Sequence, residues 1–560
     1  MSEQKQLSLG RRKFVKGIAA AGVILPLTTF APLAWAYDRK EAELRGNTFN
    51  LEIVPLPVNF TGKQRTATAV NGLLPGPILK LKEGDLVTIR VTNRLDEMTT
   101  IHWHGIILDY GMDGVPGISF PGIEPGETFV HRFKVVQHGT YWYHAHTLAE
   151  QTGVYGALVI EPSDASDEMH VDRDYPVVLS DWTDENPVDV YMNLKKMSGY
   201  YNYRRLTAAD FVDDVSILGL REAISKRIIW NKTRMSPNDF SDISAATYTY
   251  LMNGHSPTGN WNGIAKAGER VRLRFIAAST ATFFDVRIPG LKLTVISTDG
   301  QRVRPVEVDE FRLGSGETYD VIVTIPDNQA YTIFAQSMDR SGYARGTLSP
   351  QPGMQASVPK LEAPVPLEAV DMMGAMAQGS VAVVKERKNP NHARSEYGSG
   401  VDMRVDYPRL NIDDPGPGLR NNGRHVLTYA DLRSSHVAPS SQPVTQEIEL
   451  HLTGNMERFI WSIDGLKLNE AKPIHFRKDE RIRIIFHNDS TMIHPMHLHG
   501  MWSDLEAPDG TFQVRKHTIS VQPAQRVSML VTADAEGRWA FHCHLLYHMA
   551  AGMFREVIVA

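Results

Sequence analysis

Cysteine is almost absent from this chain, which has 560 residues and a single cysteine, Cys543. One cysteine has no partner for a disulfide within the chain. A lone cysteine most often packs as a small apolar residue in a protein core. Here its neighbours differ from those of a core residue, because Cys543 stands between His542 and His544, with His548 and Met553 downstream. A thiolate with imidazoles and a thioether is a ligand set that suits copper.

The chain also has little excess charge of either sign. Its net charge is −5 at pH 7 and it has no basic stripe, which makes nucleic acid an unfavoured partner. The hydrophobic fraction of 42% and the charged fraction of 22% are ordinary for a soluble globular protein. The 43 glycines and 32 prolines favour a loop-rich β architecture, and the length predicts three or four domains.

A long apolar run is missing except for a weak one near the N-terminus. The stretch "LGRRKFVKG" contains Arg11 and Arg12, and the run that follows, 18–36, ends in "AWA". This is the pattern of a signal peptide with a small-residue cleavage site, and the paired arginines are similar to the Tat export signal. Prolines and threonines interrupt the run, which argues against a membrane anchor. We therefore predict a Tat-type signal peptide over residues 1–36, export to the periplasm and no stable membrane anchor.

An internal repeat organises the rest of the chain. The segment "EGDLVTIRVTN" (83–93) alternates apolar and polar residues as a strand does, and "AGERVRLRFIA" (267–277) and "KDERIRIIFHN" (478–488) match it. The segment "GTYWYHAH" (139–146) aligns without a gap with "GRWAFHCH" (537–544). The outer two copies share strands and histidine pairs, whereas the middle copy has the strand alone. The repeat predicts an all-β fold of three related β-sandwiches.

The repeat and the composition also predict domain boundaries. The expected sandwich domains are residues 45–165, 166–345 and 441–560, of which the middle one has no metal ligands. Between the last two lies 346–440, a proline- and glycine-rich stretch that we expect to be a loop-like linker. Its run "DMMGAM" contains three methionines: Met372, Met373 and Met376. Some helix is expected within 207–245.

Histidines gather in four short motifs. Ten of the 21 histidines lie in "HWH", "HAH", "HPMHLH" and "HCHLLYH". In an H-x-H pair on a strand both imidazoles point to one face, because side chains alternate. One such pair is weak evidence for a metal, but four repeat-related pairs are hard to explain as packing. A structural zinc needs only four ligands, so this number of donors predicts several metal ions.

Cys543 should face away from its two histidine neighbours if it lies on an extended strand. Its thiolate can then bind one metal while both imidazoles bind a cluster on the opposite face. One residue of backbone on either side would connect the two sites, which suits electron transfer. The cysteine is therefore predicted to be an electron relay as well as a ligand.

In this order, the motifs H-x-H-G, H-x-H, H-x-x-H-x-H and H-C-H-x3-H-x4-M resemble those of the three-domain multicopper oxidases. The resemblance covers the whole mature chain. Within that family the chain is most similar to the periplasmic copper-resistance oxidases of bacteria, on "NGLLPGPIL" (71–79), "YTYLMNG" (248–254) and the twin-arginine leader. It implies three cupredoxin-like Greek-key β-sandwich domains. It also implies an oxidase that couples four one-electron oxidations of a substrate to the reduction of O2 to water.

The resemblance further implies four copper ions and their ligands. The implied ligands of one blue type 1 copper are His494, Cys543, His548 and, axially, Met553. Those of one type 2 copper are His102 and His497. Those of a coupled type 3 pair are His104, His144, His146, His499, His542 and His544. The reduction of O2 also needs protons, and Asp113 lies where relatives have a carboxylate near the cluster. Asp113 is expected either to relay protons or only to form a turn before Gly114.

Three functions are compatible with the sequence. The first is oxidation of Cu(I), and of other small reductants, in periplasmic copper resistance. Four methionines near the type 1 ligands suit Cu(I), or else they only fill the core: Met492, Met496, Met501 and Met549. The second is a laccase-like oxidation of phenols or of Mn(II). The third is non-catalytic copper storage, which does not need a cysteine joined to a histidine cluster. The sequence says nothing of protein partners or of the oligomeric state.

Overall fold

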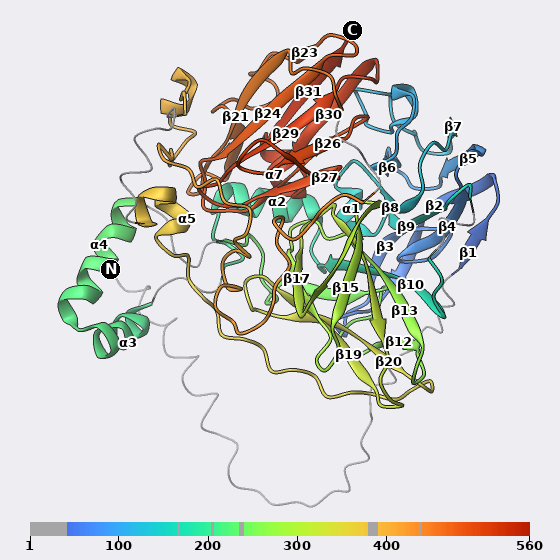
Figure 1. Cartoon of the computed structure of the whole chain (residues 1–560), viewed down its shortest axis with the longest axis horizontal. Helices are drawn as coiled ribbons and strands as arrows, with labels where there is room; N and C mark the ends of the chain where they lie inside the picture. Colours follow the sequence, from blue (N-terminus) through green and yellow to red (C-terminus); the bar gives the residue numbers. More distant parts are fainter. Residues whose placement is uncertain (1–41, 165–168, 203–206, 234–239, 379–389, 436–439) are drawn as a thin grey trace, which may run out of the picture. The chain divides into compact units, whose positions relative to one another are not determined.

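The computed structural model describes residues 42–164, 169–202, 207–233, 240–378, 390–435 and 440–560. The predicted signal peptide, residues 1–36, lies outside the described residues. Strands dominate the fold, which confirms the predicted all-β class (Figure 1). In the described part of the chain, no helix has both the length and the apolar character needed to cross a membrane.

The first sandwich has two sheets. One contains, in spatial order, β3 (Arg65–Val70), β2 (Thr48–Val58), β5 (Leu86–Asn93) and β7 (Thr128–Lys134). The other contains β1 (Glu43–Arg45), β4 (Gly76–Lys82), β9 (Tyr155–Glu161), β8 (Gly139–His144) and β6 (His102–His104). In β5, Val87, Ile89 and Val91 are buried while Arg90 between them is exposed. The apolar face of the strand therefore lies in the core, as the alternating sequence predicts.

The middle sandwich is built in the same way. One sheet contains β11 (Thr249–Met252), β10 (Arg173–Trp182), β13 (Arg270–Ala277), β18 (Thr318–Thr324), β15 (Leu293–Thr298) and β16 (Gln301–Val308). The other contains β12 (Trp261–Ile264), β20 (Tyr343–Ser349), β19 (Tyr331–Ser337), β14 (Phe284–Arg287) and β17 (Glu310–Leu313). β20 runs past residue 345, where this domain was expected to end. Gly346 lies within this strand, where a Cβ would meet Met252 Sδ at 2.6 Å.

The last sandwich also has two sheets. One contains β22 (Ile460–Ile463), β21 (Gln446–Asn455), β24 (Arg481–Asn488), β29 (Arg526–Thr532), β26 (Ser503–Glu506) and β27 (Phe512–Lys516). The other contains β23 (Ile474–Phe476), β31 (Phe554–Val559), β30 (Gly537–Cys543), β25 (His494–Leu498) and β28 (Thr518–Val521). The second sheet positions the cysteine and its neighbouring histidines, because β30 pairs antiparallel with β25.

The three matching segments of the sequence occupy the same position in their sheets. β5, β13 and β24 each pair in parallel with an earlier strand, namely β2, β10 and β21. Each also pairs antiparallel with a later strand, namely β7, β18 and β29. The histidine motifs lie in the other sheet of the outer sandwiches, where β6 pairs with β8 as β25 pairs with β30. Equivalent strands therefore carry the histidines in the first and last sandwiches.

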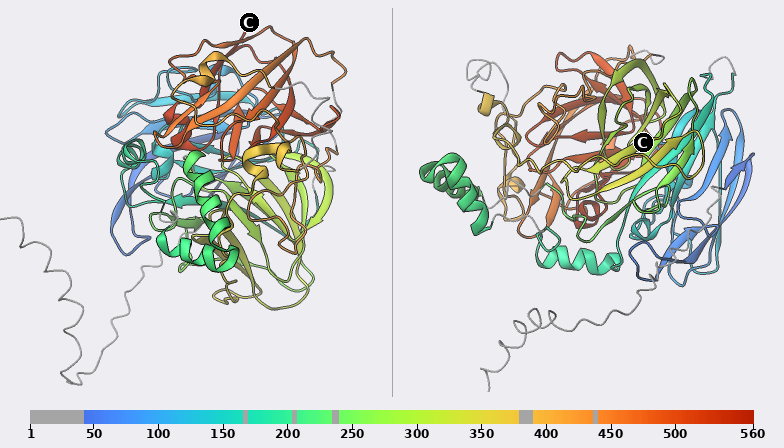
Figure 2. Two further views of the ribbon diagram at one scale, coloured as in Figure 1. Left: turned by 90° about the vertical axis from the view of Figure 1, so that its left-hand side faces the viewer. Right: turned by 90° about the horizontal axis from the view of Figure 1, so that it is seen from below.

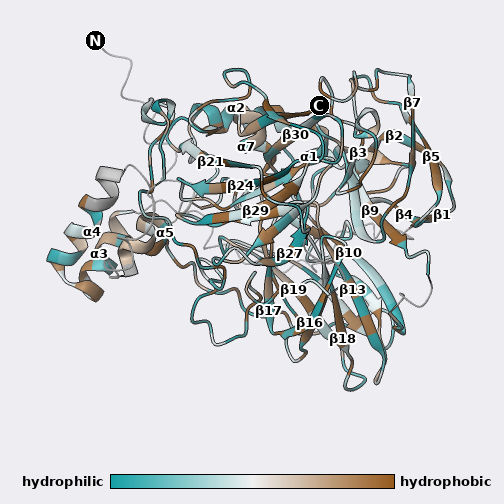
Figure 3. Ribbon diagram, turned by 45° about the horizontal axis from the view of Figure 1, so that its top comes forward, coloured by the Kyte–Doolittle hydropathy of each residue, from teal (hydrophilic) through white to brown (hydrophobic). Residues whose placement is uncertain are grey.

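Helices are few in the described residues. α2 (Pro187–Lys196) touches the last sandwich, because the Tyr191 hydroxyl donates to the carbonyl of Ala550 (3.2 Å). α3 (Ala208–Leu218) and α4 (Leu220–Thr233) form the helical segment expected within 207–245, to one side of the sheets (Figures 1 and 2). Figure 3 shows apolar stretches on this pair of helices, and the apolar side chains of Val212 and Ile217 are exposed. The short helical turns are α1 (Ala149–Thr152), α5 (Val370–Met373), α7 (Leu546–Ala551), η1 (Tyr110–Met112), η3 (Gly374–Gln378) and η4 (Arg394–Tyr397).

Parts of the predicted linker, 346–440, are packed against the sandwiches. Arg420 donates to both carboxylate oxygens of Asp371 (2.9 and 2.6 Å), and Asp371 is fully buried. Arg409 is also buried, and it donates to the carbonyl of Pro523 in the last sandwich (3.1 Å). The linker is loop-like in its secondary structure, but it forms a fixed covering layer in these parts.

Candidate metal centre

Eight histidines from the first and last sandwiches come together in one buried cluster. The first sandwich supplies His102, His104, His144 and His146. The last sandwich supplies His497, His499, His542 and His544. Every one of them is between 0 and 7% exposed. The middle sandwich supplies none of the eight.

Ring nitrogens from different strands meet inside the cluster. His542 Nε2 lies 3.1 Å from His146 Nε2 and 3.0 Å from His499 Nε2. Imidazole nitrogens that meet at this distance share either a proton or a cation. Five other ring nitrogens in the cluster are buried without a hydrogen-bond partner: His102 Nε2, His104 Nδ1, His144 Nε2, His497 Nε2 and His544 Nε2. Buried polar atoms without partners are rare in folded proteins, so the donor set fits a metal ion as the common partner of these nitrogens.

The outward nitrogens of these rings already have partners. His102 Nδ1 donates to the carbonyl of Asp113 (2.7 Å), and His497 Nδ1 donates to the carbonyl of His517 (2.7 Å). A carbonyl can only accept, so the proton of each ring is on Nδ1 and the lone pair is on Nε2. A hydrogen bond on one imidazole nitrogen that directs the other to a shared centre is typical of metal-binding histidines.

Burial keeps the cluster imidazoles neutral. It lowers the pKa of His104, His144 and His497 well below its usual value, and neighbouring imidazoles lower it further. Burial also lowers the pKa of His542, to about 4. Neutral imidazoles with lone pairs directed at one another are the form in which histidine binds a metal.

A second site lies on the other side of β30. The Sγ atom of Cys543 is 3.5 Å from His494 Nδ1 and 3.9 Å from His548 Nδ1, and the two nitrogens are 3.2 Å apart. Met553 is fully buried, and its carbonyl accepts from the backbone N–H of Cys543 (3.1 Å). Burial raises the pKa of the Cys543 thiol above its usual range. A bound cation would therefore have to displace a proton from this sulfur.

Side chains outside the motifs fix the two histidines of this second site. Asp242 accepts a hydrogen bond from His548 Nε2 (2.9 Å), and burial raises the pKa of Asp242 to about 7. The Ser490 hydroxyl lies 2.7 Å from His494 Nε2. Trp461 stacks on the ring of His548 at 3.9 Å between centroids. Both imidazoles are thus held by one nitrogen, with Nδ1 directed at the cysteine.

Asp113 connects the two sandwiches at the cluster. It is 1% exposed, its Oδ2 accepts from His499 Nδ1 (2.9 Å), and its Oδ1 lies 3.3 Å from His102 Nδ1. Gly114 supplies the turn, because its φ is +85° and a Cβ there would meet the carbonyl of Ile101 at 1.9 Å. A turn-forming role alone therefore does not account for the buried carboxylate of Asp113.

Three further residues at the cluster have no signal in the sequence motifs. Glu150 accepts from His144 Nδ1 (3.0 Å), and burial raises the pKa of Glu150 well above its usual value. Ser315 of the middle sandwich lies 3.0 Å from His544 Nδ1. His517 is buried, its Nε2 has no hydrogen-bond partner, and its ring lies 4.7 Å from that of His104. His517 stands alone in its segment, so pair spacing does not reveal it.

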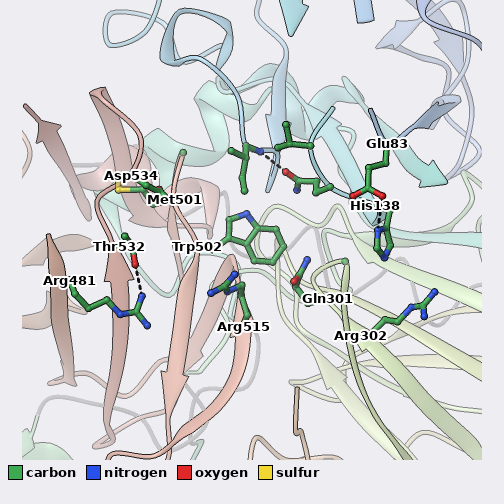
Figure 4. Close-up of a pocket in the computed structure, with 15 residues that line it drawn as sticks. Glu83, His138, Gln301, Arg302, Arg481, Met501, Trp502, Arg515, Thr532 and Asp534 are labelled. Atoms are coloured by element: carbon green, nitrogen blue, oxygen red, sulfur yellow. Dashed lines mark hydrogen bonds and ion pairs between the residues drawn. The ribbon is translucent and has the colours of Figure 1, made fainter. Parts of the chain in front are cut away.

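A cavity of about 330 Å³ opens beside the cluster. Figure 4 shows Trp502 in the middle of its lining residues. Its other labelled lining residues include three arginines: Arg302, Arg481 and Arg515. A smaller cavity shares Trp502 with it and reaches His102, His497 and His499. The two cavities meet at Trp502, next to three histidines of the cluster.

Comparisons with known proteins agree on one family. Three segments of the chain match family profiles described as multicopper oxidase: 53–165, 173–353 and 441–560. The chain is 50% identical to copper resistance protein A of Pseudomonas syringae pv. tomato, over 98% of this chain and 99% of that protein. It is 48% identical to copper resistance protein A of Escherichia coli, over 99% of each chain.

Solved structures show the same fold at much lower identity. Fet3p, described as a multicopper oxidase that functions in iron import, superimposes with a TM-score of 0.66 at 18% identity, over 92% of this chain and 90% of that one. A multi-copper oxidase from Pseudomonas thermotolerans gives a TM-score of 0.60 at 20% identity, over 93% and 100%. These likenesses support three cupredoxin-like sandwiches, as the sequence predicts.

Proposed function

The chain belongs to the multicopper oxidase family, and we propose that it oxidises Cu(I) with O2 in bacterial copper resistance. Enzymes of this family couple oxidation of a reductant to reduction of O2. The observation that carries the proposal is the position of Cys543, with two imidazole nitrogens within 3.9 Å of its Sγ. Its chain neighbours His542 and His544 belong to the eight-histidine cluster on the opposite side. The identity of about half to copper resistance protein A of two bacteria supports Cu(I) as the substrate.

The donor atoms fit four copper ions, and we propose the following ligands. Type 1 copper would be held by His494, Cys543, His548 and Met553. Type 2 copper would be held by His102 and His497. The type 3 pair would be held by His104, His144, His146, His499, His542 and His544. The buried unpartnered nitrogens of five of these residues support the assignment, because each offers a lone pair where no protein donor reaches it.

The protein contributes to the reaction mainly by orienting the ligand side chains and by excluding water from them. Bound copper supplies the one-electron chemistry that links oxidation of the substrate to the four-electron reduction of O2. Asp242 and Ser490 fix the rings of His548 and His494, so that Nδ1 of each faces Cys543. Full burial of Cys543 excludes bulk water from its thiolate.

Two buried carboxylates are placed to handle protons. We propose that Asp113 passes protons toward the place where O2 is reduced, because its Oδ2 already accepts from His499 Nδ1. Glu150 accepts a hydrogen bond from His144 Nδ1, and a small cavity beside Trp502 reaches three other histidines of the cluster, His102, His497 and His499. Both carboxylates lie within hydrogen-bond distance of proposed ligands, which is the range that general acid catalysis requires.

The proposal is tested by measuring O2 consumption with three reductants side by side. The copper-loaded protein should show its highest kcat/KM with Cu(I), and lower values with a phenol and with Mn(II). A higher value for the phenol or for Mn(II) would instead support a laccase-like or metal-oxidising enzyme. Absence of O2 consumption with all three would support copper storage.

We also propose that residues 1–36 direct export to the periplasm through the Tat pathway. The support is the Arg11–Arg12 pair in front of a short apolar run. Replacing both arginines with lysine should leave the protein in the cytoplasmic fraction of a Gram-negative host. The matched control Lys16→Arg should still be exported. Export of the double lysine variant at the wild-type level would exclude the Tat signal.

A further inference from the structure

A second cluster of histidines and carboxylates lies apart from the ligands proposed above. Its members are His392, Glu396, His451, His487 and Asp489. His451 and His487 are paired residues of the neighbouring strands β21 and β24, and Asp489 follows β24. Glu396 lies on η4, in the predicted linker, with His392 just before that turn. Both carboxylates are 0% exposed, and the His392 side chain is only 5% exposed.

Four donor atoms of this cluster converge. His392 Nδ1 lies 2.7 Å from Glu396 Oε2 and 3.7 Å from Asp489 Oδ2. His451 Nδ1 lies 2.6 Å from Asp489 Oδ2 and 3.3 Å from Glu396 Oε2. Each nitrogen is therefore between two carboxylate oxygens rather than paired with one. A tetrahedral ion with bonds of ~2.0–2.2 Å has ligand atoms about 3.3–3.5 Å apart. The two longer distances lie near that value, and the two shorter ones are hydrogen-bond distances that a bound ion would lengthen.

The carboxylates are oriented by their other oxygen atoms. Oε1 of Glu396 accepts from the backbone N–H of Ala393 (2.7 Å), which leaves Oε2 directed at the two histidines. Oδ1 of Asp489 accepts from the backbone N–H of Val405 (2.7 Å), which leaves Oδ2 directed at the same place. Hydrogen bonds of this kind orient the carboxylate ligands of metal sites before the ion arrives.

The charge of the cluster is balanced either by protonation of its histidines or by a bound cation. In the part of the chain that the structure describes, neither Glu396 nor Asp489 forms an ion pair with a lysine or an arginine. Two buried carboxylates without such partners are costly. Protonation of both partner histidines would balance them, and a divalent ion would do so while leaving the imidazoles neutral.

His487 is a separate sign of a missing ligand. It is 2% exposed, and neither of its ring nitrogens has a hydrogen-bond partner. Its ring stacks on that of His451, with centroids 4.7 Å apart and planes 16° apart. A buried imidazole with neither ring nitrogen bonded, stacked on a histidine of the cluster, indicates that the polar cluster is incomplete without a further group.

We propose that His392, Glu396, His451 and Asp489 bind a divalent transition-metal ion in addition to the copper ions. Zinc is the ion that two imidazoles and two carboxylates in a closed tetrahedral arrangement fit best. The site joins η4 of the linker to strands of the last sandwich, so the ion fastens the linker to that sandwich. It is a structural site, because all four ligand positions come from the protein.

Metal analysis of the intact protein tests the site. Copper-loaded protein is exposed to zinc, freed of excess metal by gel filtration, and analysed for zinc and copper. Wild type should retain about one zinc per chain besides its copper, as one closed site requires. His392→Ala and Glu396→Gln should each lose this zinc, with unchanged copper content and visible absorption. His425→Ala removes a half-exposed histidine of the same linker and should retain the zinc.

Thermal unfolding of the same proteins guards against simple misfolding. Added zinc should raise the Tm of wild type and of His425→Ala, and it should leave the Tm of Glu396→Gln unchanged. Glu396→Gln keeps the size of the side chain, so the variant should fold even if His392→Ala does not. Wild type without bound zinc, or both variants with as much zinc as wild type, would overturn the proposal.

Discussion

At the scale of single residues, several cluster histidines are oriented by a hydrogen bond from the ring nitrogen that does not face the cluster. His102 and His497 donate from Nδ1 to backbone carbonyls, and His499 donates to the carboxylate of Asp113. The tautomer of each ring is therefore set by the fold, so little reorganisation is needed when a metal binds. Asp242 does the same for His548 from the segment after α4.

Cys543→Ser should abolish the intense visible absorption of the copper-loaded protein. That absorption requires a copper–thiolate bond, and serine cannot supply one. The eight-histidine cluster keeps all its donors, so copper content should fall without reaching zero. The visible spectrum and metal analysis together measure both effects. A strong remaining band would contradict the type 1 assignment.

Asp113→Asn should slow O2 reduction while the protein keeps its copper. The amide oxygen can still accept from His499 Nδ1, but the side chain cannot pass a proton. Loss of a general acid is typically worth ~10²–10⁴-fold in rate. Asp113→Ala is the companion variant, and it should also lose copper because the ring of His499 is no longer held. Equal O2 consumption by wild type and Asp113→Asn across pH 5–8 would exclude the proton role.

The sequence predicted the motif histidines because H-x-H on a strand places both rings on one face. Their bonding partners could not be predicted in the same way. Asp242 and Ser315 come from segments without a metal motif, and only the tertiary fold brings them to His548 and His544. His517 is likewise a lone histidine. The predicted membership of the multicopper oxidases is confirmed, since family profiles cover most of the chain.

At the scale of elements, the short helical run α5 and η3 limits which methionines can meet Cu(I). Met373 and Met376 are 46% and 51% exposed, whereas Asp371, which precedes them in the run, is buried against Arg420. The methionines near the proposed type 1 ligands are mostly inaccessible: Met492, Met496 and Met501 are 2–3% exposed. An incoming Cu(I) ion can reach the thioethers of the helical run directly.

Replacing Met373 and Met376 with leucine should raise KM for Cu(I) several-fold and leave phenol oxidation unchanged. Thioethers bind Cu(I) but have little affinity for a phenol, and leucine preserves volume. Steady-state O2 consumption with the two substrates measures the effect. Met492→Leu, at a buried position, is the control and should change neither KM. Unchanged kinetics of the double variant with Cu(I) would exclude capture by this run.

Strands were the most predictable elements, because burial on one face leaves a period of two in the sequence. β5 follows this pattern at nearly every residue. The end of β20 was less predictable, because glycine is uncommon inside strands. Only the fold shows that Met252 lies too close to residue 346 to leave room for a side chain there. The linker was predicted as loop but not as a buried layer, because Asp371 and Arg409 are charged residues that only tertiary contacts can bury.

At the scale of the whole molecule, the cluster joins two sandwiches that are distant in sequence. Its histidines come equally from the first and the last, while Ser315 of the middle sandwich lies 3.0 Å from His544 Nδ1. Copper bound here should therefore resist separation of the sandwiches as well as local unfolding. The metal acts on the stability of the chain as any ligand of the folded state does.

Copper loading should raise the Tm of the protein, and His497→Ala should reduce that gain. At a free copper concentration 100-fold above Kd, one site stabilises the folded state by ~2.7 kcal/mol. Scanning calorimetry of copper-free and copper-loaded protein measures the difference. His425→Ala, outside the cluster, should gain as much as wild type. Identical Tm values with and without copper would contradict a cluster that spans the sandwiches.

The wide separation of the cluster histidines along the chain also affects when during synthesis the cluster can form. At about 5–20 residues per second, translation of the about 350 residues between His146 and His497 takes roughly 17–70 s. During this interval the nascent first sandwich presents His102, His104, His144 and His146 with no counterpart from the last. Metal binding before that interval ends would occupy only the four histidines of the first sandwich, with whichever ion is present in the cytoplasm. Correct assembly of the cluster therefore requires that the metal bind after translation of the last sandwich, and not during it.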